Sequence, residues 1–138
     1  MKFTINNRFA DIPPLADQVD AYMTDEGVSL ETIMTTNLCL EELLTNTIKY
    51  GYGDNRIRQI DIDMRLLDGE LTIEIVDDAA PFDPTSDAQT PDIDATIEER
   101  PIGGLGIFLV TNFTDSMQYN RELNRNRLIL KKRLAQNM

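Results

Sequence analysis

Histidine is absent from this chain of 138 residues, and cysteine occurs only once, as Cys39. Without histidine, the chain can form neither a Ser-His-Asp triad nor phosphohistidine, and most kinds of zinc site are excluded. A single cysteine excludes an internal disulfide and indicates a reducing compartment. No apolar run reaches the length of a membrane span, and the first residues lack the apolar core of a signal peptide. We therefore expect a cytoplasmic protein.

Positive charge is also scarce, with 13 Lys and Arg against 24 Asp and Glu and a net charge of −11. This balance argues against nucleic acid or an anionic membrane as the main partner. It fits a basic protein partner, a nucleotide whose charge is carried by a metal, or solubility alone. The length is sufficient for one compact domain, so we expect residues 1–138 to form a single domain.

The first part of the chain predicts one strand and two helices. Residues 2–9 read as a strand, and Pro13-Pro14 then start a helix from about Leu15 to Asp25. Gly27 ends this helix. Ser29 is a suitable N-cap for a second helix that runs to about Tyr50.

Alternating apolar residues replace the helical period in the second part of the chain. They predict strands at 60–66, 71–76, 116–121 and 127–132, with a helix from about 105 to 113. The hairpin residues Asp68-Gly69 join the first two of these strands, and residues 123–126 join the last two. The segment 78–102 is rich in Asp, Pro, Thr and Ala and predicts a mobile flap. The expected fold is α+β, an antiparallel sheet with helices on one face.

The predicted helix 29–50 carries an apolar face and an opposite polar stripe. At about 100° per residue, Glu42, Asn46 and Lys49 fall within about one sixth of its circumference. Asn46 offers an uncharged oxygen to Mg²⁺, Glu42 can take a proton from an attacking hydroxyl or water, and Lys49 can balance phosphate charge. An ordinary solvated helix face carries the same residue types, so the stripe alone leaves both interpretations open.

Two turns add to this pattern. Asp77 follows a predicted strand and can accept a hydrogen bond from an exocyclic amine such as that of adenine, although Asp also favours solvated turns. Gly103-Gly104-Leu105-Gly106 opens the helix 105–113, where backbone N–H groups and the helix dipole can hold phosphates. A flexible hinge explains these glycines equally well. No Lys-Ser/Thr follows them, and no parallel βαβ unit surrounds them, so Walker A and Rossmann sites are excluded.

Taken together and in this order, the three segments resemble the GHKL (Bergerat-fold) ATPases. The ordered set is Glu42-x-x-x-Asn46-x-x-Lys49-Tyr50, then Asp77-x-Ala79, then Gly103-Gly104-Leu105-Gly106. The chain is more similar to the small anti-sigma-factor serine/threonine kinases of bacteria, through residues 77–84, 103–110, Asp115 and 126–132. The resemblance covers nearly the whole chain and implies a two-layer α/β sandwich with the nucleotide between the helices and a lid at 78–102.

The resemblance also implies ATP and Mg²⁺ as cofactors and assigns roles to residues. Glu42 would be the general base, Asn46 the Mg²⁺ ligand and Asp77 the contact to the adenine amine. The remaining nucleotide-binding positions would be Lys49, Tyr50, Ala79, Arg100 near the γ-phosphate, and the lid residues Gly103, Gly104, Leu105 and Gly106. The chain departs from the family at Ala79, where glycine is usual, and near Asn126-Arg127, which lacks the threonine that some relatives place close to adenine.

Two functions follow from the resemblance and remain open. The first is a kinase that phosphorylates a serine or threonine of an anti-anti-sigma (STAS-type) protein, sequesters a sigma factor, or does both. The second is a regulatory binding module without kinase activity, with or without nucleotide; Ala79 favours this alternative. The resemblance further implies a homodimer, for which the predicted edge strand near Lys2–Arg8 is available.

Overall fold

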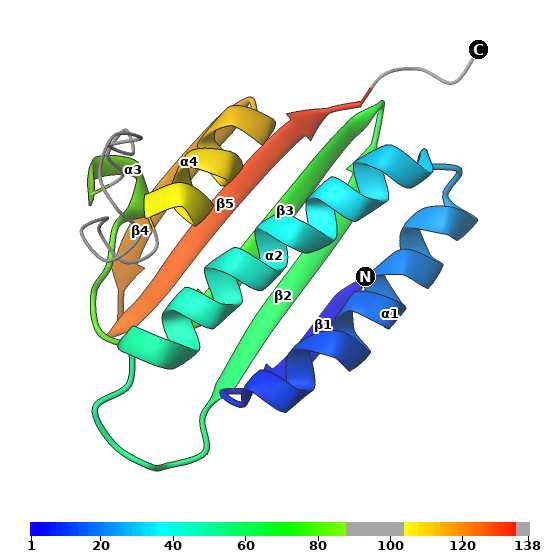
Figure 1. Cartoon of the computed structure of the whole chain (residues 1–138). Coiled ribbons are helices and arrows are strands. Elements are labelled where there is room, and N and C mark those ends of the chain that lie inside the picture. Colours follow the sequence, from blue (N-terminus) through cyan, green and yellow to red (C-terminus); the bar gives the residue numbers. More distant parts are fainter. Residues whose placement is uncertain (88–103, 135–138) are drawn as a thin grey trace.

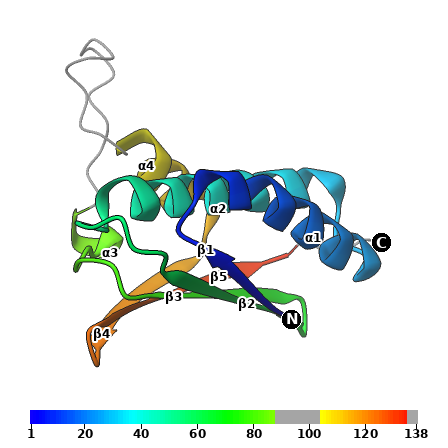
Figure 2. The same ribbon diagram turned by 90° about the horizontal axis from the view of Figure 1, so that it is seen from below.

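Figure 1 shows the computed structural model, which describes residues 1–87 and 104–134. In these residues, one antiparallel sheet has the strand order β1-β2-β3-β5-β4. The helices α1, α2 and α4 lie on the same face of this sheet, as the two ribbon views show (Figures 1 and 2). The predicted α+β fold with helices on one face is therefore confirmed.

The elements of the described residues follow one another along the chain. Their bounds are β1 (Lys2–Asn6), the 3₁₀ helix η1 (Phe9–Asp11), α1 (Ile12–Asp25), α2 (Leu30–Tyr50), β2 (Gln59–Leu67), β3 (Glu70–Asp77), α3 (Pro84–Asp87), α4 (Gly104–Phe113), β4 (Ser116–Glu122) and β5 (Arg125–Arg133). None of the helices in the described ranges is both long and apolar enough to cross a membrane.

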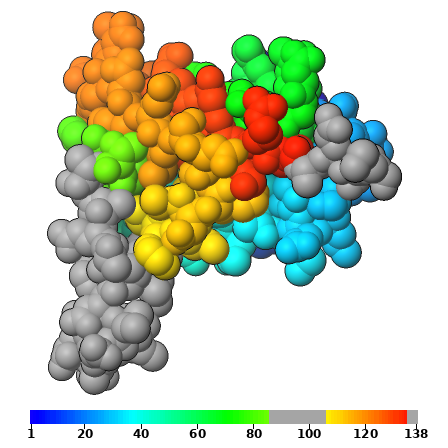
Figure 3. Space-filling view, turned by 90° about the horizontal axis from the view of Figure 1, so that it is seen from above, coloured from blue at the N-terminus to red at the C-terminus, as the bar shows by residue number. Residues whose placement is uncertain are grey.

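The hydrophobic core lies between the sheet and its helical layer. Alternate residues of the central strands point into it, among them Ile62, Ile73 and Leu130, each no more than 3% exposed. The helices contribute the buried side chains Val19 and Leu44. In the space-filling view, the surface of α4 (yellow) lies between that of α2 (cyan) and that of β4 (orange) (Figure 3). The core therefore holds α2 and α4 beside each other.

Tight turns connect the paired strands where the sequence predicts them. Asp68 and Gly69 have φ of 53° and 76°, and Leu123 and Asn124 have φ of 54° and 60°. Two successive residues with positive φ form the turn type that matches the twist of a hairpin. The turn after β4 is thus two residues long, and β5 begins at Arg125, two residues before the predicted start at 127. This correction places Asn126 inside the sheet.

The first elements also differ from their predicted bounds. The strand β1 ends at Asn6 and not at residue 9, because the N–H of Arg8 donates to the carbonyl of Asn6 and turns the chain into η1. The helix α1 begins at Ile12, before the predicted start at Leu15. Pro13 and Pro14 therefore lie in its first turn, where a missing N–H removes no hydrogen bond of the helix.

The predicted flap at 78–102 is only partly described. Its first residues are attached to the body of the domain, because the N–H of Ala80 donates to the carbonyl of Gly51 at 2.7 Å. The short helix α3 follows at Pro84–Asp87, where the sequence predicts irregular structure. Residues 88–102 of the flap lie outside the described residues.

The beginning of α2 allows a test of the folded state. The hydroxyl of Ser29 accepts a hydrogen bond from the N–H of Thr32 at 3.3 Å, which confirms the predicted N-cap. We expect Ser29→Ala to lower the free energy of unfolding by about 1 kcal/mol, because a backbone N–H of the first turn loses its partner. Urea unfolding measures this change. Thr35→Ala is the control, since among the described residues the Thr35 hydroxyl bonds only to the Glu31 carbonyl within α2. It should change stability by no more than about 0.5 kcal/mol.

Candidate functional site

The polar stripe of α2 faces the beginning of α4. Glu42 and Asn46 are both partly buried on this stripe. A Cβ atom built on Gly106 would overlap the carboxylate of Glu42. Glycine at this position therefore lets the first turn of α4 lie directly against Glu42. The structure thus brings together Glu42 and Gly106, two predicted site residues that are far apart in the sequence.

A pocket of about 310 Å³ lies at the C-terminal end of α2. Its wall is formed by the C-terminal end of α2, the end of β3, the beginning of β5, the neighbouring part of β4 and the turn after β3. The residues used below are Asn46, Tyr50, Asp77, Ala79, Tyr119 and Asn126. A concave site with an apolar lining and a few polar groups suits a small ligand. Four predicted site residues, Asn46, Tyr50, Asp77 and Ala79, therefore share one pocket.

Asp77 is the buried carboxylate of this pocket, with 7% of its surface exposed. It is the last residue of β3, and it continues the inward-facing row of Ile73 and Ile75. Its Oδ1 accepts hydrogen bonds from the N–H of Ala79 at 3.0 Å and from Nδ2 of Asn126 at 2.9 Å. Burial raises the pKa of Asp77, and these two hydrogen bonds oppose the rise because they stabilise the ionised form.

Ala79 packs against the end of α2. A Cβ built on Gly51 would come within 2.7 Å of the Ala79 Cβ and within 2.6 Å of the carbonyl oxygen of Thr47. The absence of a side chain at Gly51 therefore makes room for the Ala79 methyl group, which is 3% exposed. The effect of this methyl group on nucleotide affinity stays a prediction.

Lys49 and Tyr50 differ in their relation to the pocket. Tyr50 lines the pocket, but Lys49 is exposed and is not part of its wall. The ammonium of Lys49 lies 5.3 Å from the ring centroid of Tyr50, a cation–π arrangement. The structure therefore places the charge of Lys49 over Tyr50, and its predicted role beside phosphate stays a prediction.

The glycine turn 103–106 that follows the predicted lid is described from Gly104 onward. Gly104 is the first residue of α4, as expected for glycines that open a helix. Arg100 and Gly103 lie outside the described residues, and of Leu105 only the helical backbone is described. Their assignment to the phosphates stays a prediction.

Asn126 is a site residue that the sequence analysis did not predict. It lies opposite Asp77 in the register of β3 and β5, and it continues the inward-facing row of Leu128 and Leu130. The period of two in β5 was the available signal, since Asn126 has the same parity as these two leucines. The signal was missed because the predicted strand began at Arg127, two residues after the observed start at Arg125.

The described residues contain no group of three or more Cys, Asp or Glu side chains that is suited to a metal ion. Asn46 offers one amide oxygen at the pocket. Such a donor fits an Mg²⁺ ion that arrives with nucleotide phosphates, because Mg²⁺ commonly takes few protein ligands and several oxygens from phosphates and water. Asn46 is therefore the residue of the pocket that would hold this ion.

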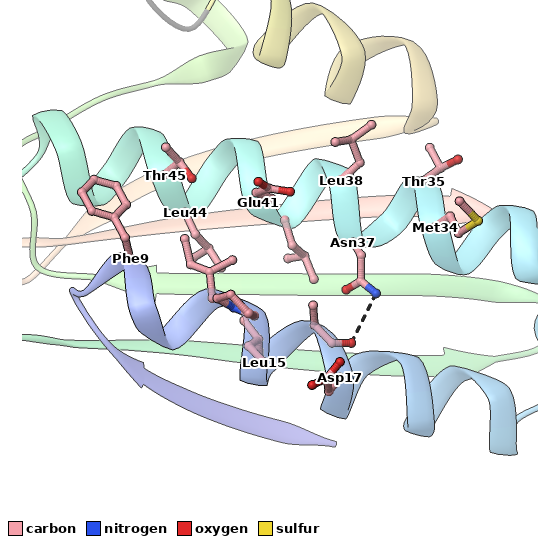
Figure 4. Close-up of a pocket in the computed structure, with 14 residues that line it drawn as sticks. Phe9, Leu15, Asp17, Met34, Thr35, Asn37, Leu38, Glu41, Leu44 and Thr45 are labelled. Carbon is pink, nitrogen blue, oxygen red and sulfur yellow. Dashed lines mark hydrogen bonds between the residues drawn. The ribbon is translucent and has the colours of Figure 1, made fainter.

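A second pocket of about 810 Å³ lies between α1 and α2. Figure 4 shows the lining residues Leu15 and Asp17 on α1 and Asn37 and Glu41 on α2, with Nδ2 of Asn37 donating to the backbone oxygen of Ala16 at 3.3 Å. Glu41 points about 100° away from Glu42 around α2. This larger pocket is thus separate from the one that contains Asn46 and Asp77.

The fold and the pocket agree with what the comparison with protein families finds. The model of the histidine kinase-like ATPase domain matches residues 5–132. The chain belongs to this family. The resemblance to the GHKL ATPases and their anti-sigma kinases, inferred from the motifs, is therefore confirmed at the level of the family.

Two known proteins are similar in sequence to this ATPase domain. The chain is 26% identical over 117 residues to an anti-sigma F factor of Clostridium novyi, a match that covers 84% of this chain and 81% of the relative. It is 28% identical over 96 residues to the serine/threonine-protein kinase BtrW of Bordetella bronchiseptica, covering 70% of this chain and 67% of the relative.

A solved structure shows the same fold. The RsbU and RsbW domains of a Mycobacterium tuberculosis protein superpose on this histidine kinase-like ATPase domain with a TM-score of 0.65 at 11% identity. The match covers 99% of this chain and 33% of the larger one. At this identity the likeness concerns the fold alone.

Proposed function

We propose that this ATPase domain binds Mg-ATP in the pocket at the end of α2 and transfers the γ-phosphoryl group to a serine or threonine of a STAS-type anti-anti-sigma protein. Sequestration of a sigma factor would be the second part of the same regulatory role. The observation that carries the proposal is the arrangement around α2: Glu42 lies against Gly106, and Asn46 shares a pocket with Asp77. The names of the two relatives support the same role.

Each residue of this arrangement has a chemical part in the proposed reaction. Asp77 would accept a hydrogen bond from the adenine amine, and Asn46 would contribute an oxygen ligand to Mg²⁺, which when bound would neutralise charge at the phosphates. The partner's hydroxyl oxygen forms a bond to the γ-phosphorus, the bond from that phosphorus to the bridging oxygen of ADP breaks, and Glu42 takes the hydroxyl proton. Catalysis of this kind rests mainly on positioning and electrostatics.

The test is phosphoryl transfer to a STAS-type protein from the same genome. The chain is incubated with this protein and Mg-ATP, and intact mass spectrometry measures both proteins. The proposal expects one phosphate on a serine or threonine of the STAS-type protein, and none when ATP or Mg²⁺ is omitted. No phosphate on any STAS-type protein of that genome, with ATP bound to the chain, would contradict the kinase proposal.

The second candidate is a regulatory module that binds its partner without phosphorylating it. Ala79 favours this candidate, because it lines the pocket where the family usually has glycine. A stable complex with a sigma factor or a STAS-type protein, formed without phosphoryl transfer, is its expected result. A homodimer is a further proposal, for which β1 is suitable because it lies at an edge of the sheet.

A further inference from the structure

The Asn126 side chain has an amide whose orientation is fixed by its neighbours. Its Nδ2 donates to Oδ1 of Asp77 at 2.9 Å and to the carbonyl oxygens of Ala80 at 3.0 Å and Ala79 at 3.2 Å. Its Oδ1 accepts from the hydroxyl of Tyr119 and from Nη1 of Arg121, the latter at 3.0 Å. Turning the amide over would place its oxygen against three acceptors and its N–H groups against the guanidinium of Arg121, which can only donate. The observed orientation is therefore the one that matches donors to acceptors, with the two N–H groups shared among three acceptors.

The two carboxylate oxygens of Asp77 consequently differ in their hydrogen bonds. Oδ1 accepts both the Asn126 amide and the N–H of Ala79. Oδ2 accepts no hydrogen bond from the described part of the chain, while Asp77 lines the pocket. One oxygen therefore holds the carboxylate in place, and the other remains available to a ligand in the pocket.

We propose that Asn126 is the positioning residue of the adenine site. By donating to Oδ1 of Asp77, it orients Oδ2 toward the base and keeps this carboxylate a hydrogen-bond acceptor only. A carboxylate held in this way selects adenine over guanine. This inference rests on the proposed binding of ATP and adds a residue and a specificity to it. The same amide also fastens the turn at Ala79 and Ala80 to β5. Arg121 strengthens this attachment by donating to the Ala79 carbonyl at 2.8 Å.

The selection follows from the donor and acceptor pattern of the two bases. Adenine carries an amine donor at the position where guanine carries a carbonyl acceptor. An ionised carboxylate can only accept, so it pairs with the adenine amine and is repelled by the oxygen of a guanine that lies in the same orientation. A protonated Asp77 would offer a donor to guanine. Discrimination between adenine and guanine therefore requires that Asp77 stays ionised and that its carboxylate keeps its position.

The surroundings of Asp77 make its ionisation depend on this amide. Burial and the neighbouring charge of Asp78 raise the pKa of Asp77, whereas the Asn126 amide, the Ala79 N–H and the charge of Arg121 lower it. Tyr52, in the segment after α2, also lies near; its own pKa is raised, chiefly by burial and then by the charge of Asp77. Without the Asn126 amide, fewer interactions oppose the effect of burial on Asp77, so the pKa of Asp77 should rise.

The experiment compares the wild type with Asn126→Val and Asn126→Thr, two side chains of the same shape that both favour strands. Threonine keeps a hydroxyl donor and valine has none. NMR titration of the Asp77 carboxyl carbon without nucleotide gives its pKa, and calorimetry gives the affinities for ATP and GTP across pH. We expect Asn126→Val to raise the pKa of Asp77 and to weaken ATP binding about 10- to 100-fold. On acidification, Asn126→Val should lose ATP binding at a higher pH than the wild type does. Asn126→Thr should recover part of each effect.

The two readouts separate this inference from the proposed function. If the wild type binds no ATP, the proposed function is wrong, and the titration without nucleotide still decides whether Asn126 keeps Asp77 ionised. An unchanged titration of Asp77 in folded Asn126→Val overturns the inference. Should Asn126→Val not fold, Tyr119→Phe removes only the hydroxyl that orients the amide, and we expect a smaller rise in the pKa of Asp77. An unchanged titration in that variant would then overturn the inference.

Discussion

Glu42→Gln is expected to lower the rate of phosphoryl transfer by about 10²- to 10⁴-fold while leaving the affinity for Mg-ATP nearly unchanged. Glutamine has almost the same shape but cannot take the proton of the attacking hydroxyl. Its amide still fits beside Gly106, where there is no side chain to displace it. Single-turnover transfer to the STAS-type protein measures the rate, and calorimetry measures the affinity.

Glu41→Gln provides the matched control for this prediction. Glu41 belongs to the same helix but lines the separate pocket between α1 and α2, so the transfer rate should stay at that of the wild type. Transfer at the full rate by Glu42→Gln would show that Glu42 is not the base. Loss of ATP affinity together with rate would instead assign Glu42 to nucleotide binding.

Gly106→Ala should produce the second large effect. The added Cβ would overlap the carboxylate of Glu42, so α4 must move away from α2 or Glu42 must leave its position. A displacement of about 1 Å at a reacting group can cost about 10²-fold in rate, and we expect a fall of this size in phosphoryl transfer. The measurement is the same single-turnover assay, with circular dichroism to establish that the variant is folded.

Gly53→Ala serves as the control for the glycine substitution. A Cβ at Gly53 would meet no atom of the described ranges within 4 Å, so neither transfer nor ATP affinity should change. If Gly106→Ala transfers phosphate as fast as the wild type, the close approach of α4 to Glu42 has no part in catalysis.

Local signals in the sequence predicted most of the fold. The residues with positive φ at Asp68 and Gly69 are of the types that such turns require, and Ser29 caps the helix it was expected to cap. The period of two in the strands and the helical period between Leu30 and Tyr50 follow from which side of each element faces the core. These features depend on neighbours within a few residues, so the sequence alone was sufficient for them.

The site was predicted less completely, because it depends on contacts between distant segments. The pairing of Asn126 with Asp77 is a matter of strand register, which the error of two residues in the predicted start of β5 concealed. The packing of Ala79 against Gly51 joins a turn to the end of a helix, and no local pattern encodes it. Likewise, the position of Lys49 over Tyr50 is a choice of side-chain conformation that helix geometry leaves open.

The central claim is that the pocket containing Asn46 and Asp77 binds Mg-ATP, and calorimetric titration tests it most directly. ATP is titrated with and without Mg²⁺ into the wild type, Asn46→Ala and the control Asn37→Ala, whose amide lines the other pocket. The account predicts Mg²⁺-dependent binding by the wild type and by Asn37→Ala that Asn46→Ala abolishes. Absence of binding by the wild type, or equal binding by folded Asn46→Ala, would contradict it.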